Sequence, residues 1–304
     1  MFRGRDPAAR IRRFAGRTMG TGWSLAIAAG PADARARVET VLAQVIAESS
    51  LWEAESEISR FNRAPAGVSL PVSPGFAEVV GAALAIAEAS NGAFDPGLAA
   101  IADSWGFGPG GARENAEPGE WRAMKLENGR LIQPGTIALD LNAIAKGQAV
   151  DRAAAALREA GAAHFLMEIG GEYRGEGVKP DGQPWWVEIE QPPGAALPPL
   201  RVALSGLSIA TSGDYRRAVM RGGKRFSHSI DPTTGQPIAE GVASVAVLGR
   251  SCMIADAEAT AITVLGAAQG YDWAVSRGLA AQILLREGGG FREVLTPALA
   301  GMLG

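Results

Sequence analysis

Apolar residues that recur at three- and four-residue steps predict several amphipathic helices along the chain. In residues 31–46 the stripe consists of Val38, Val41, Leu42, Val45 and Ile46, and we expect it to face the core. Ser73 as a cap and Pro74 in the first turn predict a second helix that ends near residue 91. The same spacing predicts two more helices, over residues 145–161 and 255–265.

Short segments that are rich in branched or aromatic residues and bounded by Gly or Pro predict strands. They cover residues 164–169, 185–190, 200–204, 243–248 and 282–285. Because helices and strands alternate irregularly, the pattern favours an α+β fold in two lobes over a repeating βαβ array. Residues 108–120 are dense in Gly, Pro and charged residues, which is typical of a surface loop.

Composition narrows the class of protein. The chain of 304 residues with 47% hydrophobic content can bury a sizeable core. Its formal net charge of -3 provides no positive excess to hold a polyphosphate strand, so we expect no nucleic-acid partner. The single cysteine, Cys252, excludes an internal disulfide and a cysteine-cluster metal site.

The N-terminal residues contain no apolar run long enough for a signal peptide or a membrane span. We therefore expect a flexible leader over residues 1–17, a single domain of two lobes over residues 18–304, and no membrane span. The expected location is the cytoplasm, or the periplasm if a leader precedes Met1.

One carboxylate and one hydroxyl share a face of the last predicted helix. Asp256 and Thr260 are four residues apart in an otherwise apolar segment, so their side chains lie side by side on a helix. Oxygen ligands of this kind suit Mg²⁺, which often bridges to substrate phosphates. The alternative is that Asp256 caps its own helix or lies in its first turn.

A second polar segment joins a predicted strand to a predicted helix. It runs from Asp140 to Lys146, and loops at such junctions face ligands. Lys146 can hold a phosphate near the helix N-terminus. It can equally form a surface ion pair with Asp140, and such pairs are common and individually weak.

Two segments of small residues have the same two interpretations. Gly170 and Gly171 follow a predicted strand and either form a tight turn or allow a flat ligand to approach the backbone closely. Thr211 and Ser212 lie in a run of small and hydroxylated residues that can surround a pyrophosphate or form a capped turn.

Only two histidines are present, and they lie in different contexts. His228 lies in a polar turn before Asp231 and Pro232, where it can accept a proton near neutral pH or serve a structural role. His164 opens an apolar strand, and we expect it to be structural. The common nucleotide-loop, serine-hydrolase and zinc-protease signatures are absent from the sequence.

Taken together, these segments resemble the FAD:protein FMN transferase family, often called ApbE. The family's Met-Gly-Thr, its serine-rich box, Phe-Asp-Pro and Trp-Gly-Phe motifs match residues 19–21, 50–62, 94–96 and 105–107. The remaining blocks follow in the family order at residues 140–151, 170–171, 210–215, 228–232 and 255–260. The resemblance therefore runs nearly end to end, from Thr18 to about Gly266.

This resemblance implies an FAD site in a cleft between the two lobes. The matching flavin-site positions are Met19, Trp52, Ala93, Phe94, Asp95, Asp140 and Lys146, joined by Gly170, Gly171, Thr211, Ser212 and Ser229. Trp52 departs from the tyrosine that the family often has, which keeps the stacking surface but moves the hydrogen-bonding group. The resemblance also implies that Mg²⁺ is held by Asp256, Thr260 and a main-chain oxygen near Ala143.

The implied activity is the Mg²⁺-dependent transfer of FMN from FAD, through a phosphoester bond, to a Thr or Ser hydroxyl of an acceptor protein, with AMP leaving. His228 would be the general base, oriented by Asp231, and Lys146 would assist at the phosphates. The expected partners are FAD and a flavoprotein or redox subunit that carries a Thr/Ser flavinylation motif. The alternatives are an FAD pyrophosphatase that releases FMN and AMP, and a flavin-binding protein without turnover.

Overall fold

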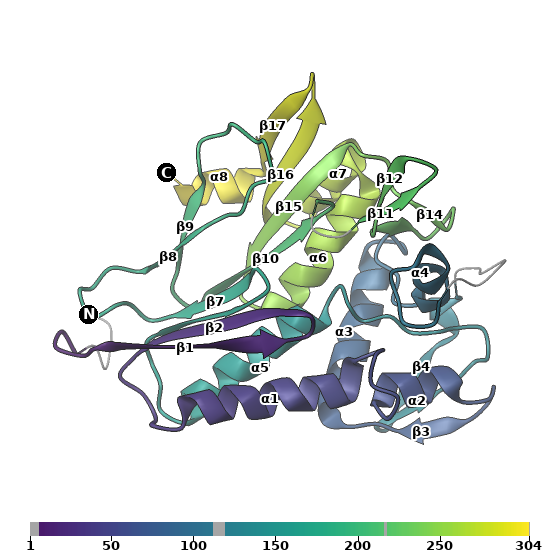
Figure 1. The fold of residues 1–304 in the computed structure, drawn as a ribbon, viewed down its shortest axis with the longest axis horizontal. Helices are drawn as coiled ribbons and strands as arrows, with labels where there is room; N and C mark the ends of the chain where they lie inside the picture. Colours follow the sequence, from purple (N-terminus) through teal and green to yellow (C-terminus); the bar gives the residue numbers. More distant parts are fainter. Residues whose placement is uncertain (1–5, 112–118, 216–217, 304) are drawn as a thin grey trace.

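The computed structural model describes residues 6–111, 119–215 and 218–303, and it confirms the α+β class (Figure 1). Its largest unit is a sheet of eight strands in the order β1-β2-β6-β7-β10-β15-β16-β17. Every neighbouring pair in this sheet is antiparallel. The strands are β1 (Ile11–Thr18), β2 (Thr21–Ala28), β6 (Phe165–Ile169), β7 (Glu172–Glu176), β10 (Leu207–Gly213), β15 (Val242–Gly249), β16 (Ala280–Glu287) and β17 (Gly290–Leu295).

Smaller sheets and eight α-helices surround this sheet within the described residues. The helices are α1 (Ala34–Ser49), α2 (Glu57–Arg63), α3 (Pro74–Ala89), α4 (Ala99–Trp105), α5 (Ala145–Glu159), α6 (Cys252–Leu265), α7 (Ala267–Ser276) and α8 (Pro297–Leu303), with a 3₁₀ helix, η1, at Trp121–Ala123. The short strands are β3 (Ser69–Pro71), β4 (Lys125–Glu127), β5 (Arg130–Ile132), β8 (Trp185–Glu188), β9 (Arg201–Leu204), β11 (Ala218–Arg221), β12 (Lys224–Ser227), β13 (Ile230–Asp231) and β14 (Gln236–Pro237).

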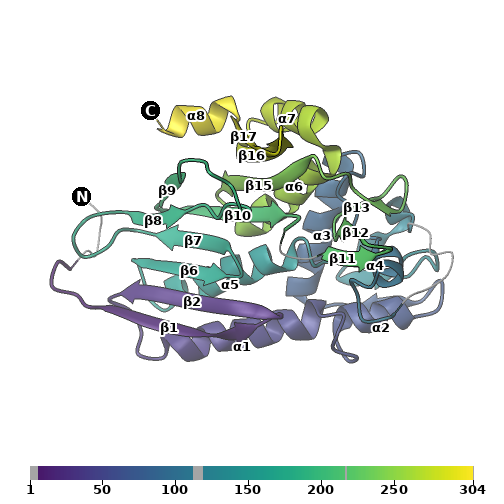
Figure 2. The same cartoon turned by 45° about the horizontal axis from the view of Figure 1, so that its top comes forward.

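Alternate residues of the large sheet face two different cores, as the period of two in a strand requires. In β15, Val245 and Val247 belong to the core that the sheet shares with α1, α5 and α6. Ala246 and Leu248 belong to the core on the other face, which contains residues of β8, β9 and α8. Figure 2 shows the strands in succession, with α8 beyond the β16–β17 end and α1 beside β1 and β2. Both faces of the sheet are therefore covered.

Helix α6 lies between the sheet and a second, mainly helical core. One of its stripes packs in the sheet core and consists of Cys252, Ala255, Ala259 and Ile262. Another packs against residues of α2 and α3 and consists of Met253, Ala257 and Ala261. A helix that is apolar on most of its surface is buried in this way. Polar residues of α6 between these stripes therefore lie in the interior, where the two cores meet.

The four predicted helices are present as α1, α3, α5 and α6, and α6 begins at Cys252, three residues before the predicted start. The five predicted strands are present as β6, β8, β9, β15 and β16. Residues 112–118 of the predicted loop lie outside the described residues. Among the helices that the structure describes, none combines the length and the apolar character that a bilayer crossing requires.

The predicted flexible leader is wrong for residues 11–17, which form most of β1. This strand pairs with β2 along its whole length, from Ile11 opposite Ala28 to Thr18 opposite Thr21. Phe14 packs against the sheet core, and the Arg12 guanidinium donates to the carbonyl oxygens of Gly30 and Pro31 at 2.9 and 2.8 Å. The arginines hide the strand pattern in the sequence because β1 is an edge strand, where exposed charged side chains are common.

Candidate functional site

The N-terminal turns of α5 and α6 meet at a buried carboxylate. Asp256, 3% exposed, accepts a hydrogen bond on Oδ2 from the Gly147 N–H at 3.1 Å. Gly147 is in the first turn of α5, whose own N-cap residue Ile144 provides no side-chain cap. The prediction that Asp256 caps its own helix is wrong, because α6 begins four residues earlier and is capped by Ser251. Asp256 instead caps the neighbouring helix.

Burial changes the ionisation of this carboxylate. Loss of solvent raises the pKa of Asp256, while the Lys146 ammonium and the Gly147 N–H act in the opposite direction. A positive charge that bound beside Asp256 would therefore relieve an existing electrostatic cost.

A second carboxylate, that of Glu172, holds Lys146 close to Asp256. The Lys146 Nζ forms an ion pair with Glu172 Oε1 at the start of β7, where Glu172 is only 1% exposed. Burial acts to lower the pKa of Lys146, but the charges of Asp256 and Glu172 outweigh it and raise the value to about 12. Lys146 therefore carries a positive charge at neutral pH. Lys146 thus forms an ion pair with Glu172, and the surface pair with Asp140 remains a prediction.

Two further oxygens at this junction suit a hard cation. Within the described residues the Thr260 hydroxyl makes no hydrogen bond, whereas Thr263 of the same helix donates to the Ala259 carbonyl at 2.8 Å. Nor does any described backbone N–H donate to the Ala143 carbonyl, because the Gly147 N–H that would reach it in a regular helix goes to Asp256. The donor set of carboxylate, hydroxyl and carbonyl fits Mg²⁺.

This junction differs from a metal site made of several acidic or histidine ligands. No group of three or more His, Cys, Asp or Glu side chains suited to a metal ion occurs in the part of the chain that the structure describes. A cation beside Asp256 would thus depend on neutral oxygens and on ligands from the substrate, which is common for Mg²⁺.

Asp140 and Asp95 lie on neighbouring backbone segments, of which the first leads into α5 and the second into α4. The Asp140 N–H donates to the Pro96 carbonyl at 2.8 Å, and Asp140 Oδ1 accepts from the Asn142 N–H at 2.8 Å. Asp95 Oδ1 accepts from the Gly97 N–H at 2.6 Å. Burial raises the pKa of Asp95 to about 6 despite that bond. The structure therefore brings together the two backbone segments that carry these predicted flavin-site residues.

The adjacent positions Ala93 and Phe94 have different surroundings. The Ala93 N–H donates to the Ser90 carbonyl at 3.2 Å, which makes it part of the turn after α3. Phe94 is 2% exposed and belongs to the mainly helical core. Its ring therefore stabilises the turn that carries Asp95.

The predicted glycine pair forms the tight β6–β7 turn, beside the β1–β2 turn that contains Met19. Gly170 and Gly171 have φ angles of 59° and 100°, a region that favours glycine, and Met19 is also left-handed with φ 47°. The Gly170 N–H donates to the Gly22 carbonyl at 3.1 Å. A Cβ on Gly170 would lie 2.8 Å from Thr21 Cγ2. Close approach of two turns thus explains the glycine.

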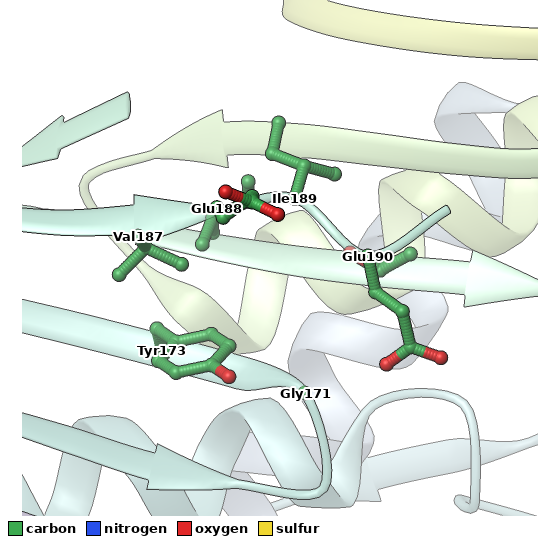
Figure 3. A pocket seen from close by; sticks show the side chains of 8 residues that line it. Gly171, Tyr173, Val187, Glu188, Ile189 and Glu190 are labelled. Carbon is green, nitrogen blue, oxygen red and sulfur yellow. The ribbon is translucent and has the colours of Figure 1, made fainter. Parts of the chain in front are cut away.

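A small pocket opens next to this turn and extends along the sheet. Its lining comes from β7, β8, the segment after β8, and β10, and it consists of Gly171, Tyr173, Val187, Glu188, Ile189, Glu190, Ile209 and Thr211 (Figure 3). Two predicted flavin-site residues, Gly171 and Thr211, therefore share one pocket. Ser212 follows on β10, so the small and hydroxylated run is a strand and not a turn.

His228 lies in a different part of the molecule, between β12 and β13. Its ring meets the Phe107 ring edge-on, with centroids 6.3 Å apart. Asp231 accepts from the Thr233 N–H at 2.8 Å and from the Thr234 hydroxyl at 3.0 Å. Ser229 is buried, and its N–H donates to Ser227 Oγ at 3.1 Å. The orientation of His228 by Asp231 remains a prediction.

A second pocket adjoins the turn of His228 and Asp231. It is lined by Asp231 and Thr234 from the β13–β14 hairpin and by Thr263, Gly266 and residues near them at the C-terminal end of α6.

Trp52 lies in the turn between α1 and α2 and lines neither of these two pockets. Its side chain is 51% exposed. Its stacking role remains a prediction.

Two residues that matter at the junction were not singled out by the sequence. Glu172 follows the glycine pair and binds Lys146. Asp151 of α5 accepts hydrogen bonds from the Ser251 hydroxyl at 2.7 Å and from the Met253 N–H at 3.0 Å. In the sequence, the only sign of such a residue is a charged side chain within an otherwise apolar strand or helix. This sign does not identify its partner, which lies far away in the sequence.

The surroundings of His164 confirm its expected structural role. The residue is 4% exposed, and its Nδ1 accepts a hydrogen bond from the Val178 N–H at 3.1 Å.

Comparisons with known proteins agree with these motifs. The ApbE family pattern matches residues 19–283. The FAD:protein FMN transferase of Haemophilus influenzae is 32% identical and covers 93% of this chain and 88% of its own length, and that of Vibrio cholerae is 34% identical and covers 94% and 91%. The apo crystal structure of the flavinyl transferase ApbE from Pseudomonas stutzeri matches with a TM-score of 0.89 at 36% identity, covering 97% of this chain and 98% of that one. The chain therefore belongs to the ApbE family.

Proposed function

We propose that this protein is an FAD:protein FMN transferase that uses Mg²⁺ and releases AMP. Family membership and the names of relatives that match nearly the whole chain support the reaction class. The observation that carries the chemical proposal is the junction of α5 and α6, where Asp256, Lys146 and Glu172 are held together. Such a cluster suits phosphoryl chemistry, which depends mainly on positioning and on neutralising charge.

In this proposal FAD lies in a cleft between two lobes and spans the predicted positions. Met19, Gly170 and Gly171 belong to two adjoining turns, and left-handed glycines without side chains let a ligand approach the backbone. Asp95 and Asp140 lie on two segments that are joined by the hydrogen bond from the Asp140 N–H to the Pro96 carbonyl. The pyrophosphate would lie near Lys146, which keeps its positive charge at neutral pH.

Asp256, Thr260 and the Ala143 carbonyl would hold the cation. Mg²⁺ bound there would neutralise charge on the pyrophosphate and on the departing AMP oxygen. Asp256 supplies the negative charge, and its Oδ2 is kept in place by the Gly147 N–H. The cation would in turn favour the ionised form of a carboxylate whose pKa burial raises.

The transfer exchanges the phosphoanhydride bond of FAD for a phosphoester bond to the acceptor. The oxygen of an acceptor Thr or Ser hydroxyl forms a bond to the FMN-side phosphorus, and the bond from that phosphorus to the bridging oxygen breaks, so that AMP leaves with that oxygen. His228 takes the hydroxyl proton. Lys146 stabilises the negative charge that develops on the phosphate oxygens. The acceptor would be a flavoprotein or redox subunit with a Thr/Ser flavinylation motif.

The test is to incubate the purified protein with FAD, MgCl₂ and an acceptor domain that carries such a motif, with EDTA as the control. We expect the acceptor to gain one FMN, seen by mass spectrometry and in-gel flavin fluorescence, together with stoichiometric AMP. Release of free FMN and AMP with no labelled acceptor would instead identify an FAD pyrophosphatase. FAD that stays intact under all conditions would identify a flavin-binding protein. Either result, hydrolysis of FAD without labelling or intact FAD, would overturn the proposal.

A further inference from the structure

Strand β7 fixes the position of α5 through a ladder of charges. Three of its side chains at alternate positions form ion pairs with residues of α5 that extend from its first turn to its last. The pairs are Glu172 with Lys146, Arg174 with Asp151 at 3.4 Å, and Glu176 with Arg158 at 3.1 Å. A shift of α5 along β7 would break all three pairs together.

The middle pair is largely enclosed. The Arg174 side chain is 10% exposed and that of Asp151 is 23% exposed. The Arg174 guanidinium also donates to Glu176 Oε1 at 2.9 and 2.7 Å and to the Arg250 carbonyl. A planar group held at several points in this way has little freedom to move. Arg174 thus holds both Asp151 and Arg250, the residue before the N-cap of α6.

Asp151 in turn fixes the start of α6 through hydrogen bonds. Its Oδ2 accepts from the Ser251 hydroxyl at 2.7 Å and from the Met253 N–H at 3.0 Å. Ser251 Oγ accepts in turn from the Ile254 N–H at 3.2 Å. Two N–H groups of the first turn of α6 are thus satisfied, one directly by Asp151 and one by a serine that Asp151 binds.

The two helices cap each other. Asp151 of α5 caps α6, and Asp256 of α6 caps α5 through the Gly147 N–H. Asp256 lies three residues after Met253, so the rigid first turn of α6 carries the position of the cap to the carboxylate. Thr260 follows one turn later on the same side of α6. The position of both side chains therefore depends on Asp151.

We propose that Asp151 and Arg174 are positioning residues of the cation site, which hold α6 so that Asp256 lies where it binds Mg²⁺. This inference rests on the proposed function, which assigns Mg²⁺ to Asp256 and Thr260. Residues that orient metal ligands from behind commonly change metal affinity by about 10–100-fold when they are replaced. A purely structural role would lower stability and leave the Mg²⁺ affinity of the folded protein unchanged.

The experiment measures Mg²⁺ affinity separately from FAD affinity. MgCl₂ is titrated by calorimetry into FAD-loaded protein, and FAD affinity is measured by flavin fluorescence in EDTA. We expect Asp151→Ala to weaken Mg²⁺ binding by about 10–100-fold with FAD affinity in EDTA unchanged. Asp151→Asn keeps an acceptor oxygen for the Met253 N–H, and we expect an affinity between those of Asp151→Ala and the wild type. Arg158→Ala, which breaks a pair of the ladder that does not touch α6, is the matched control and should bind Mg²⁺ normally.

Asp256→Ala separates this inference from the proposed function. If Asp256→Ala loses Mg²⁺ binding while folded Asp151→Ala keeps wild-type affinity, the positioning role is wrong and the proposed cation site stands. If Asp256→Ala binds Mg²⁺ as the wild type does, the cation assignment itself fails. Should Asp151→Ala not fold, Asp151→Asn decides: a several-fold weaker affinity supports the role, and a wild-type affinity overturns it.

Discussion

Replacing Gly147 with alanine tests how closely α5 and α6 must approach. A Cβ at this position would lie 2.4 Å from the Cys252 carbonyl oxygen and 2.7 Å from Met253 Cα. Because Cβ contacts below 3.0 Å essentially never occur, the two helices would have to separate by about 0.6 Å. The distance from Gly147 N to Asp256 Oδ2 would then grow from 3.1 Å to about 3.7 Å, beyond hydrogen-bond range.

The size of the effect follows from three contributions. Overpacking against backbone atoms costs about 1–3 kcal/mol. Loss of a hydrogen bond to a charged group adds about 1.5–3 kcal/mol. The higher helix propensity of alanine offsets about 1 kcal/mol. We therefore expect Gly147→Ala to lower the free energy of unfolding by about 1.5–5 kcal/mol.

Gly81→Ala is the matched control because Gly81 also lies within a helix. A Cβ there would have its nearest neighbour, Leu126 Cδ2, at 3.8 Å, which is ordinary contact. We expect this substitution in α3 to raise the free energy of unfolding by up to about 1 kcal/mol. The assay is denaturant unfolding followed by circular dichroism, with Mg²⁺ affinity measured in parallel. If Gly147→Ala proved as stable as Gly81→Ala, the inferred close approach of the helices would be refuted.

Three further substitutions test separate parts of the site. Asp256→Asn should abolish Mg²⁺-dependent FMN transfer yet keep the fold, since the amide oxygen can still accept from Gly147 N–H; unchanged metal dependence would contradict this. His228→Ala should slow transfer by about 10²–10⁴-fold with FAD affinity unchanged, and weaker FAD binding would argue against a base. Because burial raises the pKa of Asp95 to about 6, the folded state binds this proton more tightly than the unfolded state, so stability should fall as the pH rises from about 4 through 6. Thermal unfolding of Asp95→Asn should show a smaller fall, and an identical pH profile would count against the shift.

The four longest of the described helices, α1, α3, α5 and α6, were predictable from the sequence because their signal is local. Ser73 and Pro74 mark the start of α3, and the Ser73 side chain accepts from the Phe76 N–H as the capping pattern predicts. Strands β1 and β10 were missed for opposite reasons. Exposed arginines interrupt the apolar pattern of β1, and β10 contains small hydroxylated residues that are equally typical of turns.

The individual residues of the site were also predictable, but the hydrogen bonds and ion pairs between them were not. The motifs that indicate the family include Asp256, Lys146 and the glycine pair. The partner of Lys146 is Glu172, 26 residues away, and the donors from α6 to Asp151, Ser251 and Met253, are 100 and 102 residues away. Such pairs depend on how α5 and α6 pack on the sheet, and the helical periodicity of either segment alone carries no information about that packing.

Mutual capping also explains how two carboxylates are tolerated between α5 and α6. Asp256 accepts from the first turn of α5 and Asp151 from the first turn of α6, so each negative charge lies at the positive end of the other helix. Lys146 and Arg174 from α5 and β7 add a positive charge beside each carboxylate. The protein thus supplies part of the charge balance for Asp256 before any cation binds. A cation at Asp256 would add to this balance, and its position would be set by helix geometry that already exists.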